Sequence, residues 1–96
     1  MLHYRFSTDA IADLEAISDY LRERSPDAAA RVVSSIIAAI KRACIFPASG
    51  PEIDEPGSVP GTRKLIEAKY RYVICYRVVQ RTLIVVRVFH GSQRRM

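Results

Sequence analysis

The stretch that decides the fold is residues 70–90, YRYVICYRVVQRTLIVVRVFH. It contains two runs rich in β-branched and aromatic residues, Tyr70–Val79 and Thr82–His90, separated by a gap of hairpin size. The sequence therefore predicts an antiparallel strand pair. Strict alternation in the second run would place on one face Ile84, Val86 and Val88, and on the other Val85, Arg87 and Phe89.

The segment upstream of this strand pair is rich in chain-breaking residues. Residues 47–61 hold four of the five prolines and three of the four glycines, which is typical of an exposed loop. A shorter strand is predicted after the loop, at about Arg63–Ala68. The last third of the chain is thus expected to form a three-stranded meander.

The first half of the chain carries helical periodicity. Apolar residues at positions 11, 14, 17 and 21 predict a helix over about Thr8–Arg24. Ser25 and Pro26 then form a cap and a first helical position. A second helix ending at Pro47 is predicted from an apolar stripe consisting of Ala29, Val33, Ile36, Ile37, Ile40 and Cys44.

Alternation over residues 2–6 predicts a short strand before the helices. The expected order is therefore β-α-α-β-β-β. This is an α+β fold in which the N-terminal strand and a helical hairpin pack on an antiparallel sheet. A length of 96 residues fits a single domain over residues 1–96.

Composition excludes several classes of protein. No apolar run approaches the ~18 residues of a membrane span, and the start of the chain lacks a signal-peptide pattern, so a cytoplasmic protein is expected. Cys44 and Cys75 lie in apolar segments and are interpreted as reduced, buried, small hydrophobic residues. Nothing pairs with them at metal-ligand spacing, and neither a metal nor a cofactor is expected.

The net charge of +5 is distributed unevenly. Six basic and nine acidic residues precede Gly61, whereas nine basic residues and the single acid Glu67 follow from there. The first part therefore carries −3 and the second +8. Such asymmetry indicates an acidic partner for the C-terminal part, either nucleic acid or an acidic protein segment. A basic, solvated sheet face is the alternative.

One group of residues in the basic part could support chemistry. It consists of Arg63, Arg87, His90 and Arg94, with Tyr72 and Tyr76 on the adjacent strand. Arginines bind phosphate bidentately and a histidine transfers protons near neutral pH, so the group is compatible with RNA cleavage. The alternatives are a strand-end histidine bonded to the backbone, and tyrosines packed in the core with tethered hydroxyls.

Short motifs along nearly the whole chain resemble a known family. The first half contributes Tyr4-x-Phe6-Ser7, Ala12-Asp13-Leu14-Glu15-x-Ile17-x-x-Tyr20-Leu21, Ser25-Pro26-x-Ala28-Ala29 and Phe46-Pro47-x-x-Gly50. The strands contribute Gly61-x-Arg63-x-Leu65, Tyr72-Val73-Ile74-Cys75-Tyr76-Arg77-Val78 and Val86-Arg87-Val88-Phe89-His90-Gly91. In their order and spacing these motifs resemble the RelE/ParE superfamily of bacterial toxins from type II toxin–antitoxin modules, and within it the ParE branch.

This resemblance implies a toxin that a cognate antitoxin silences by folding a disordered segment over it. RelE-like members cut mRNA in the ribosome with basic residues and often a tyrosine, whereas ParE-like members are described as poisoning DNA gyrase without catalytic residues. RelE-like toxins usually carry an arginine where this chain has Val73; Arg71 is shifted to the other sheet face. The chain also ends at Met96 without the late tyrosine of many RelE-like members.

We therefore expect a gyrase-binding toxin with no catalytic residues, with an mRNA endoribonuclease as the alternative. A ParD-like antitoxin is the expected partner, no membrane is involved, and direct nucleic-acid binding is not expected to be primary. In ParE-like chains the terminal arginine often follows His-Gly more closely than Arg94 does here. The candidate residues for binding target or antitoxin are Arg63, Arg71, Arg77, Arg87, His90 and Arg94.

Overall fold

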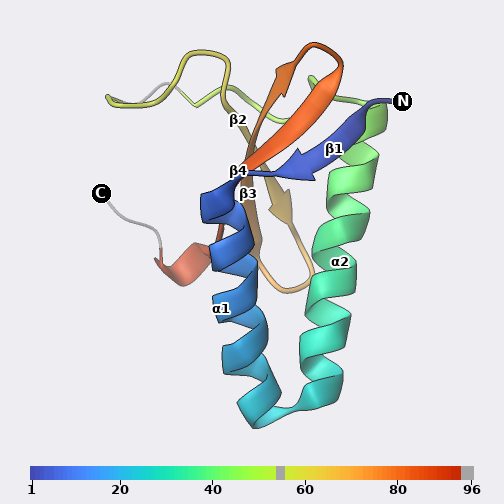
Figure 1. Cartoon of the computed structure of the whole chain (residues 1–96), viewed down its shortest axis with the longest axis vertical. Helices are drawn as coiled ribbons and strands as arrows, with labels where there is room; N and C mark the ends of the chain where they lie inside the picture. Colours follow the sequence, from blue (N-terminus) through green and yellow to red (C-terminus); the bar gives the residue numbers. More distant parts are fainter. Residues whose placement is uncertain (54–55, 94–96) are drawn as a thin grey trace.

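A computed structural model describes residues 1–53 and 56–93. The elements in chain order are β1 (His3–Phe6), α1 (Thr8–Arg24), α2 (Pro26–Ile45), β2 (Arg63–Glu67), β3 (Tyr72–Val79), β4 (Thr82–His90) and the short 3₁₀ helix η1 (Gly91–Gln93). The strands form one sheet in the order β1-β4-β3-β2, and the helical hairpin covers one face of it (Figure 1). The predicted α+β class and element order are confirmed.

Two serines define the helical hairpin. Ser7 caps α1, and its side chain accepts a hydrogen bond from the Ala10 backbone N–H. Ser25 serves both helices, because its backbone N–H donates to the Leu21 carbonyl while its hydroxyl accepts from the Ala28 N–H. Proline at the first position of α2 leaves no amide to satisfy. The hairpin thus turns at Ser25, as the sequence predicts.

The sheet is mixed. β3 pairs antiparallel with both β2 and β4, whereas β1 lies in the same sheet, parallel to β4, with His3 opposite Thr82. The β3–β4 connection is a two-residue turn at Gln80 and Arg81, whose φ angles are 49° and 67°. β1 is therefore an edge strand next to β4, and the three strands of the meander form the rest of the sheet.

A β-bulge in β4 contradicts the strict alternation predicted for that strand. Cys75 pairs with Arg87, but the next residue, Tyr76, pairs with Val85, so Val86 is the extra residue of the bulge. One inserted residue exchanges the two faces of the strand beyond it. The buried residues of β4 are consequently Leu83, Val85 and Val88, and not Ile84, Val86 and Val88.

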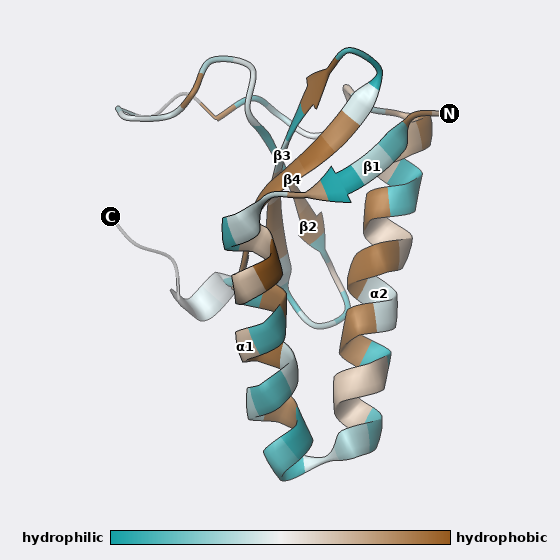
Figure 2. Ribbon diagram, in the orientation of Figure 1, coloured by the Kyte–Doolittle hydropathy of each residue, from teal (hydrophilic) through white to brown (hydrophobic). Residues whose placement is uncertain are grey.

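The core lies between the helices and the sheet. Ile36 and Ile40 of α2 pack in one buried cluster with Ile74 and Tyr76 of β3, all four fully buried. Alternating brown and teal bands along both helices show their one-sided hydrophobicity (Figure 2). In α2 the buried stripe passes through Val32 and not Val33, which is half-buried.

The two cysteines differ in burial. Cys44 is buried in the core, whereas Cys75 is half-buried, so the expectation of a buried thiol holds only for Cys44. Burial raises the pKa of Cys44 above its ordinary value, which keeps the thiol neutral. Within the described residues no helix combines the length and the apolar character that a membrane crossing requires.

Candidate functional site

A groove with a volume of about 800 Å³ lies between α1 and the end of the sheet. Its lining from α1 is Asp13, Ala16, Ile17, Tyr20 and Leu21, and from the sheet and η1 it is Tyr72, Arg87, Val88, Phe89, His90 and Ser92. The lining therefore combines apolar and aromatic side chains with a smaller number of polar ones. Such a surface suits an amphipathic protein segment.

Tyr72 and His90 contact each other on the sheet side of this groove. The His90 ring stands edge-on to Tyr72, with centroids 5.1 Å apart and an interplanar angle of 87°. The pKa of the Tyr72 hydroxyl is raised, first by burial and then by the charges of Glu67 and Tyr20. Tyr72 is therefore held in its neutral form, while Tyr20 at the rim is 56% exposed and available for contact.

His90 is held by Ser92, which lies two residues later in η1. Its Nδ1 accepts a hydrogen bond of 3.0 Å from the Ser92 backbone N–H, and the Ser92 hydroxyl lies 2.8 Å from the same atom. Because Nδ1 accepts, the ring carries its proton on Nε2. This is the arrangement expected for a strand-end histidine bonded to the backbone.

Arg87 forms a bidentate ion pair with Asp13 of α1. Its Nε and one terminal nitrogen donate to the two carboxylate oxygens at 2.8 and 3.0 Å. Asp13 also accepts a 2.9 Å hydrogen bond from the Val88 backbone N–H at the uncovered edge of β4. The hydrogen bonds to Asp13, and then its charge, raise the pKa of Arg87. Arg87 therefore lies in the groove with its charge neutralised.

Arg63 lies outside the groove and holds the proline-rich loop. One terminal nitrogen donates to the Gly50 carbonyl at 2.6 Å and to the Ala48 carbonyl at 3.4 Å. The other is 3.8 Å from the Glu52 carboxylate, and Glu52 forms an isolated bridge with Arg63. The donors of Arg63 are thus occupied by the loop that precedes β2.

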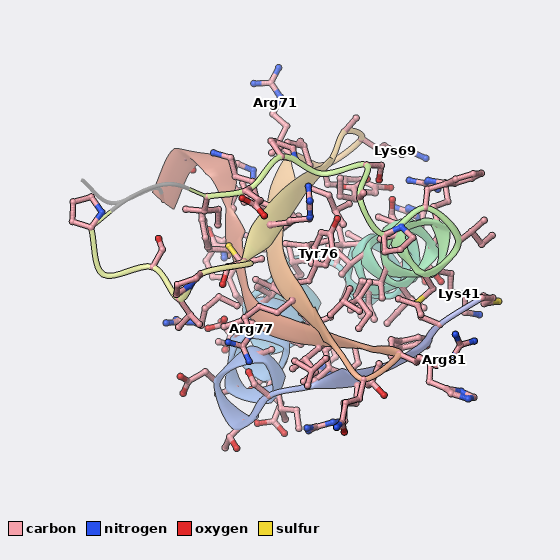
Figure 3. The ribbon with its side chains drawn as sticks, turned by 90° about the horizontal axis from the view of Figure 1, so that it is seen from above. Lys41, Lys69, Arg71, Tyr76, Arg77 and Arg81 are labelled. Atoms are coloured by element: carbon pink, nitrogen blue, oxygen red, sulfur yellow. The ribbon has the colours of Figure 1, made fainter. Side chains whose placement is uncertain are left out.

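The remaining candidates do not converge on this groove. Arg71 is exposed in the β2–β3 turn with φ 69°, and Arg77 is half-buried on β3; Figure 3 shows their side chains extending in different directions. Arg94 lies outside the described residues. Of the six candidates, the structure thus brings only Arg87 and His90 together in the groove.

Sequence reasoning missed two acidic residues with defined roles. Asp13 was expected on a solvated helix face, but its side chain is only 16% exposed, because it accepts hydrogen bonds from the Arg87 side chain and the Val88 backbone N–H. Glu67 is 2% exposed and accepts hydrogen bonds from the Ser35 hydroxyl and from backbone N–H groups of the β2–β3 turn. No local pattern indicates the contacts of Asp13, whose partners lie 74 and 75 positions away, or the contact of Glu67 with Ser35, which lies 32 positions away.

The motif Phe46-Pro47-x-x-Gly50 is explained by Tyr76. The Tyr76 hydroxyl donates to the Pro47 carbonyl at 2.7 Å and accepts from the Gly50 N–H at 3.3 Å. A Cβ at Gly50 would lie 2.3 Å from the Lys64 carbonyl oxygen, so only glycine fits. Tyr76 is thus a core residue with a tethered hydroxyl, one of the two alternatives above.

The described part of the chain contains no group of three or more His, Cys, Asp or Glu residues placed to hold a metal ion. The groove surface consists of aromatic, apolar and paired polar side chains. Its geometry suits protein recognition through a few anchors, such as Ile17 and Tyr20, more directly than proton transfer.

Comparison with known proteins agrees with the fold and the motifs. The family model of the ParE toxin of the type II toxin–antitoxin system parDE matches residues 4–95. A Sinorhizobium fredii protein with the name "Putative toxin Y4kP" is 37% identical over 90 residues, covering 94% of this chain and 88% of the relative.

Two solved structures share the fold. The chromosomal ParDE toxin–antitoxin system from P. aeruginosa matches with a TM-score of 0.74 and 26% identity, over 94% of this chain and 96% of the other. The toxin–antitoxin complex RelBE2 from Mycobacterium tuberculosis matches with a TM-score of 0.60 and 23% identity, over 93% and 96%. This chain belongs to the ParE family of toxins from type II toxin–antitoxin systems.

Proposed function

We propose that this toxin arrests growth by binding DNA gyrase in the cytoplasm, and that a ParD-like antitoxin neutralises it through the groove between α1 and the end of the sheet. The observation that carries the proposal is the state of the residues that an RNA-cutting site would need. Arg87 is paired with Asp13, and Arg63 is bound to the proline-rich loop. What is left is a surface suited to binding.

The groove supports an antitoxin segment of defined chemistry. Ile17 and Leu21 are half-buried on its helical wall, and Tyr20 is exposed at its rim. An amphipathic segment with apolar side chains at helical spacing would bury these residues. The excess of basic residues after Gly61 favours an acidic stretch in the same segment.

The target is tested with the purified toxin in two parallel assays. We expect inhibition of gyrase-dependent supercoiling and an unchanged mRNA pattern in a coupled translation extract. Codon-specific mRNA cuts without an effect on gyrase would instead establish the ribonuclease alternative and overturn the proposal.

The groove is tested by Tyr20→Ala. Loss of an exposed aromatic anchor should weaken antitoxin binding by about tenfold or more, with little change in stability. Ile11→Ala on the outer face of the same helix is the matched control, because Ile11 is also exposed and lies outside the groove lining. Equal affinity of the two variants for the antitoxin would place the antitoxin elsewhere.

A further inference from the structure

A second surface, remote from the groove, carries most of the exposed apolar side chains at one end of the molecule. Its members and their exposed fractions are Met1 77%, Ile45 53%, Phe46 67%, Val78 42% and Val79 40%. Figure 2 shows that the β3–β4 hairpin tip, the start of the chain and the end of α2 lie at this same end. We name it, together with Arg81, the hairpin-end surface.

The topology brings these three segments together. Pairing of His3 with Thr82 places the start of the chain beside the hairpin turn. The Leu2 N–H donates to the Cys44 carbonyl at 3.0 Å, which fixes the chain start against the last turn of α2. Tyr76, two residues before Val78, bonds to the residue after Phe46. The three segments that carry these apolar side chains therefore lie together at one end of the fold.

Two basic side chains, those of Lys41 and Arg81, lie at this end. Arg81 lies at the turn and Lys41 on the last turns of α2, and Figure 3 shows both side chains extending outward on the same side. The acidic residues of α1 are carried away from this end, because α1 begins at Thr8 and runs toward the opposite end (Figure 1). The hairpin-end surface is thus apolar with a cationic rim.

The turn at its tip is held in an unfavorable backbone conformation. Gln80 and Arg81 both have positive φ, a conformation for which Asn-Gly is the preferred pair in two-residue hairpins. The two residues present are long and polar, and they protrude at the tip. A stability cost is therefore accepted at a position where Arg81 is exposed.

We propose that the hairpin-end surface is where the toxin docks on its target protein, and that the target presents an apolar patch surrounded by acidic residues. Charge complementarity selects this occupant. A second copy would bring two cationic rims together, and a nucleic acid would set phosphates against five exposed apolar side chains. The inference rests on the proposed function only in that the target is a protein.

The antitoxin groove and this surface are well separated. The groove is lined by the end of β4, at Arg87–His90, whereas β4 begins beside the hairpin tip at Thr82, five residues before Arg87 and about 16 Å away at ~3.3 Å per residue. Substitutions at the hairpin end therefore leave the residues of the groove lining unchanged. The two binding events can be separated by substitution.

The test uses Phe46→Ser with Arg81→Glu, two exposed positions. Ile66→Ser with Arg31→Glu is the matched control, since both residues are exposed elsewhere, each pair replaces one exposed apolar residue by serine, and the change in charge is the same. Binding of each purified toxin to gyrase is measured by biolayer interferometry at two salt concentrations, with antitoxin affinity and growth arrest measured in parallel. Equal thermal unfolding midpoints verify that all variants are folded.

We expect the Phe46/Arg81 variant to lose about tenfold or more in gyrase affinity and in growth arrest, with antitoxin affinity and the control unchanged. The Arg81→Glu change alone should slow association and remove its acceleration at low salt. The inference is overturned if the variant binds and arrests growth like the parent, or if the control loses as much. If the unsubstituted toxin arrests growth without binding gyrase, only the gyrase target is refuted. The inference is then decided by comparing growth arrest by the Phe46/Arg81 variant and by the control. A parent that does neither overturns both.

Discussion

Asp13 offers the sharpest test of how the groove is built, because one carboxylate serves two different partners. It accepts two hydrogen bonds from the Arg87 guanidinium and one from the Val88 backbone N–H. The side chain of Arg87 is 54% exposed, whereas that of Asp13 is 16% exposed. The ion pair is therefore screened by water, while the backbone bond covers the edge of β4.

The expected free energies of unfolding follow from this difference. An exposed ion pair contributes about 0.2–1 kcal/mol, so Arg87→Gln should destabilise by less than ~1 kcal/mol. A buried N–H that loses its acceptor costs about 1–3 kcal/mol, so Asp13→Ala should destabilise by ~2–3 kcal/mol in total. Asp13→Asn keeps an acceptor oxygen for Val88 and should lie between the two, near 1 kcal/mol.

Urea denaturation of the purified toxin, followed by circular dichroism at low and high salt, measures these values. The Asp13/Arg87 double-mutant cycle should give a coupling below ~1 kcal/mol that shrinks with salt. The reasoning is refuted if Arg87→Gln costs as much as Asp13→Ala, or if Asp13→Asn is as damaging as Asp13→Ala. Either result would mean that the ion pair with Arg87 holds α1 against the sheet, and not the hydrogen bond that Asp13 accepts from the Val88 N–H.

Three further predictions concern the core, the turn and pH. Tyr76→Phe leaves the Gly50 N–H and the Pro47 carbonyl without their partner and should cost about 1–3 kcal/mol in urea denaturation, with loss concentrated in loop amide protection by hydrogen exchange. Replacing Gln80-Arg81 by Asn-Gly should raise the unfolding free energy by about 1 kcal/mol or more while weakening gyrase binding; a destabilised variant would show that the turn is unstrained. Burial opposes ionisation of Glu67, but its hydrogen bonds from Ser35 and backbone N–H groups outweigh it and lower the pKa below 4.5. The ionised Glu67 carboxylate therefore stabilises the fold above the unfolded pKa, and this stabilisation is lost as pH falls through the folded pKa. Glu67→Gln should consequently flatten the acid limb of the profile of unfolding free energy against pH, below about pH 4.5. An unchanged acid limb would contradict this.

Local chemistry was enough to predict the elements and the family. The Ser25-Pro26 cap marks the end of one helix and the start of the next, because both signals act on neighboring backbone groups. The two apolar runs around Gln80-Arg81 form the hairpin, since side chains alternate along a strand whatever it packs against. The family motifs are likewise patterns along the chain, and the match over residues 4–95 bears them out.

What only the tertiary structure decided are contacts between residues far apart in the sequence. The parallel pairing of β1 with β4 and the bulge at Val86 follow from how the sheet closes against α1, and alternation within a strand contains no information about either. The bulge sets which residues of β4 are buried. It also determines where Arg87 meets Asp13, 74 positions earlier in the chain. The basic meander was evident from composition, but pairing across the fold neutralises Arg87 and commits Arg63 to a loop, because charges are satisfied by partners in space and not by neighbors in sequence.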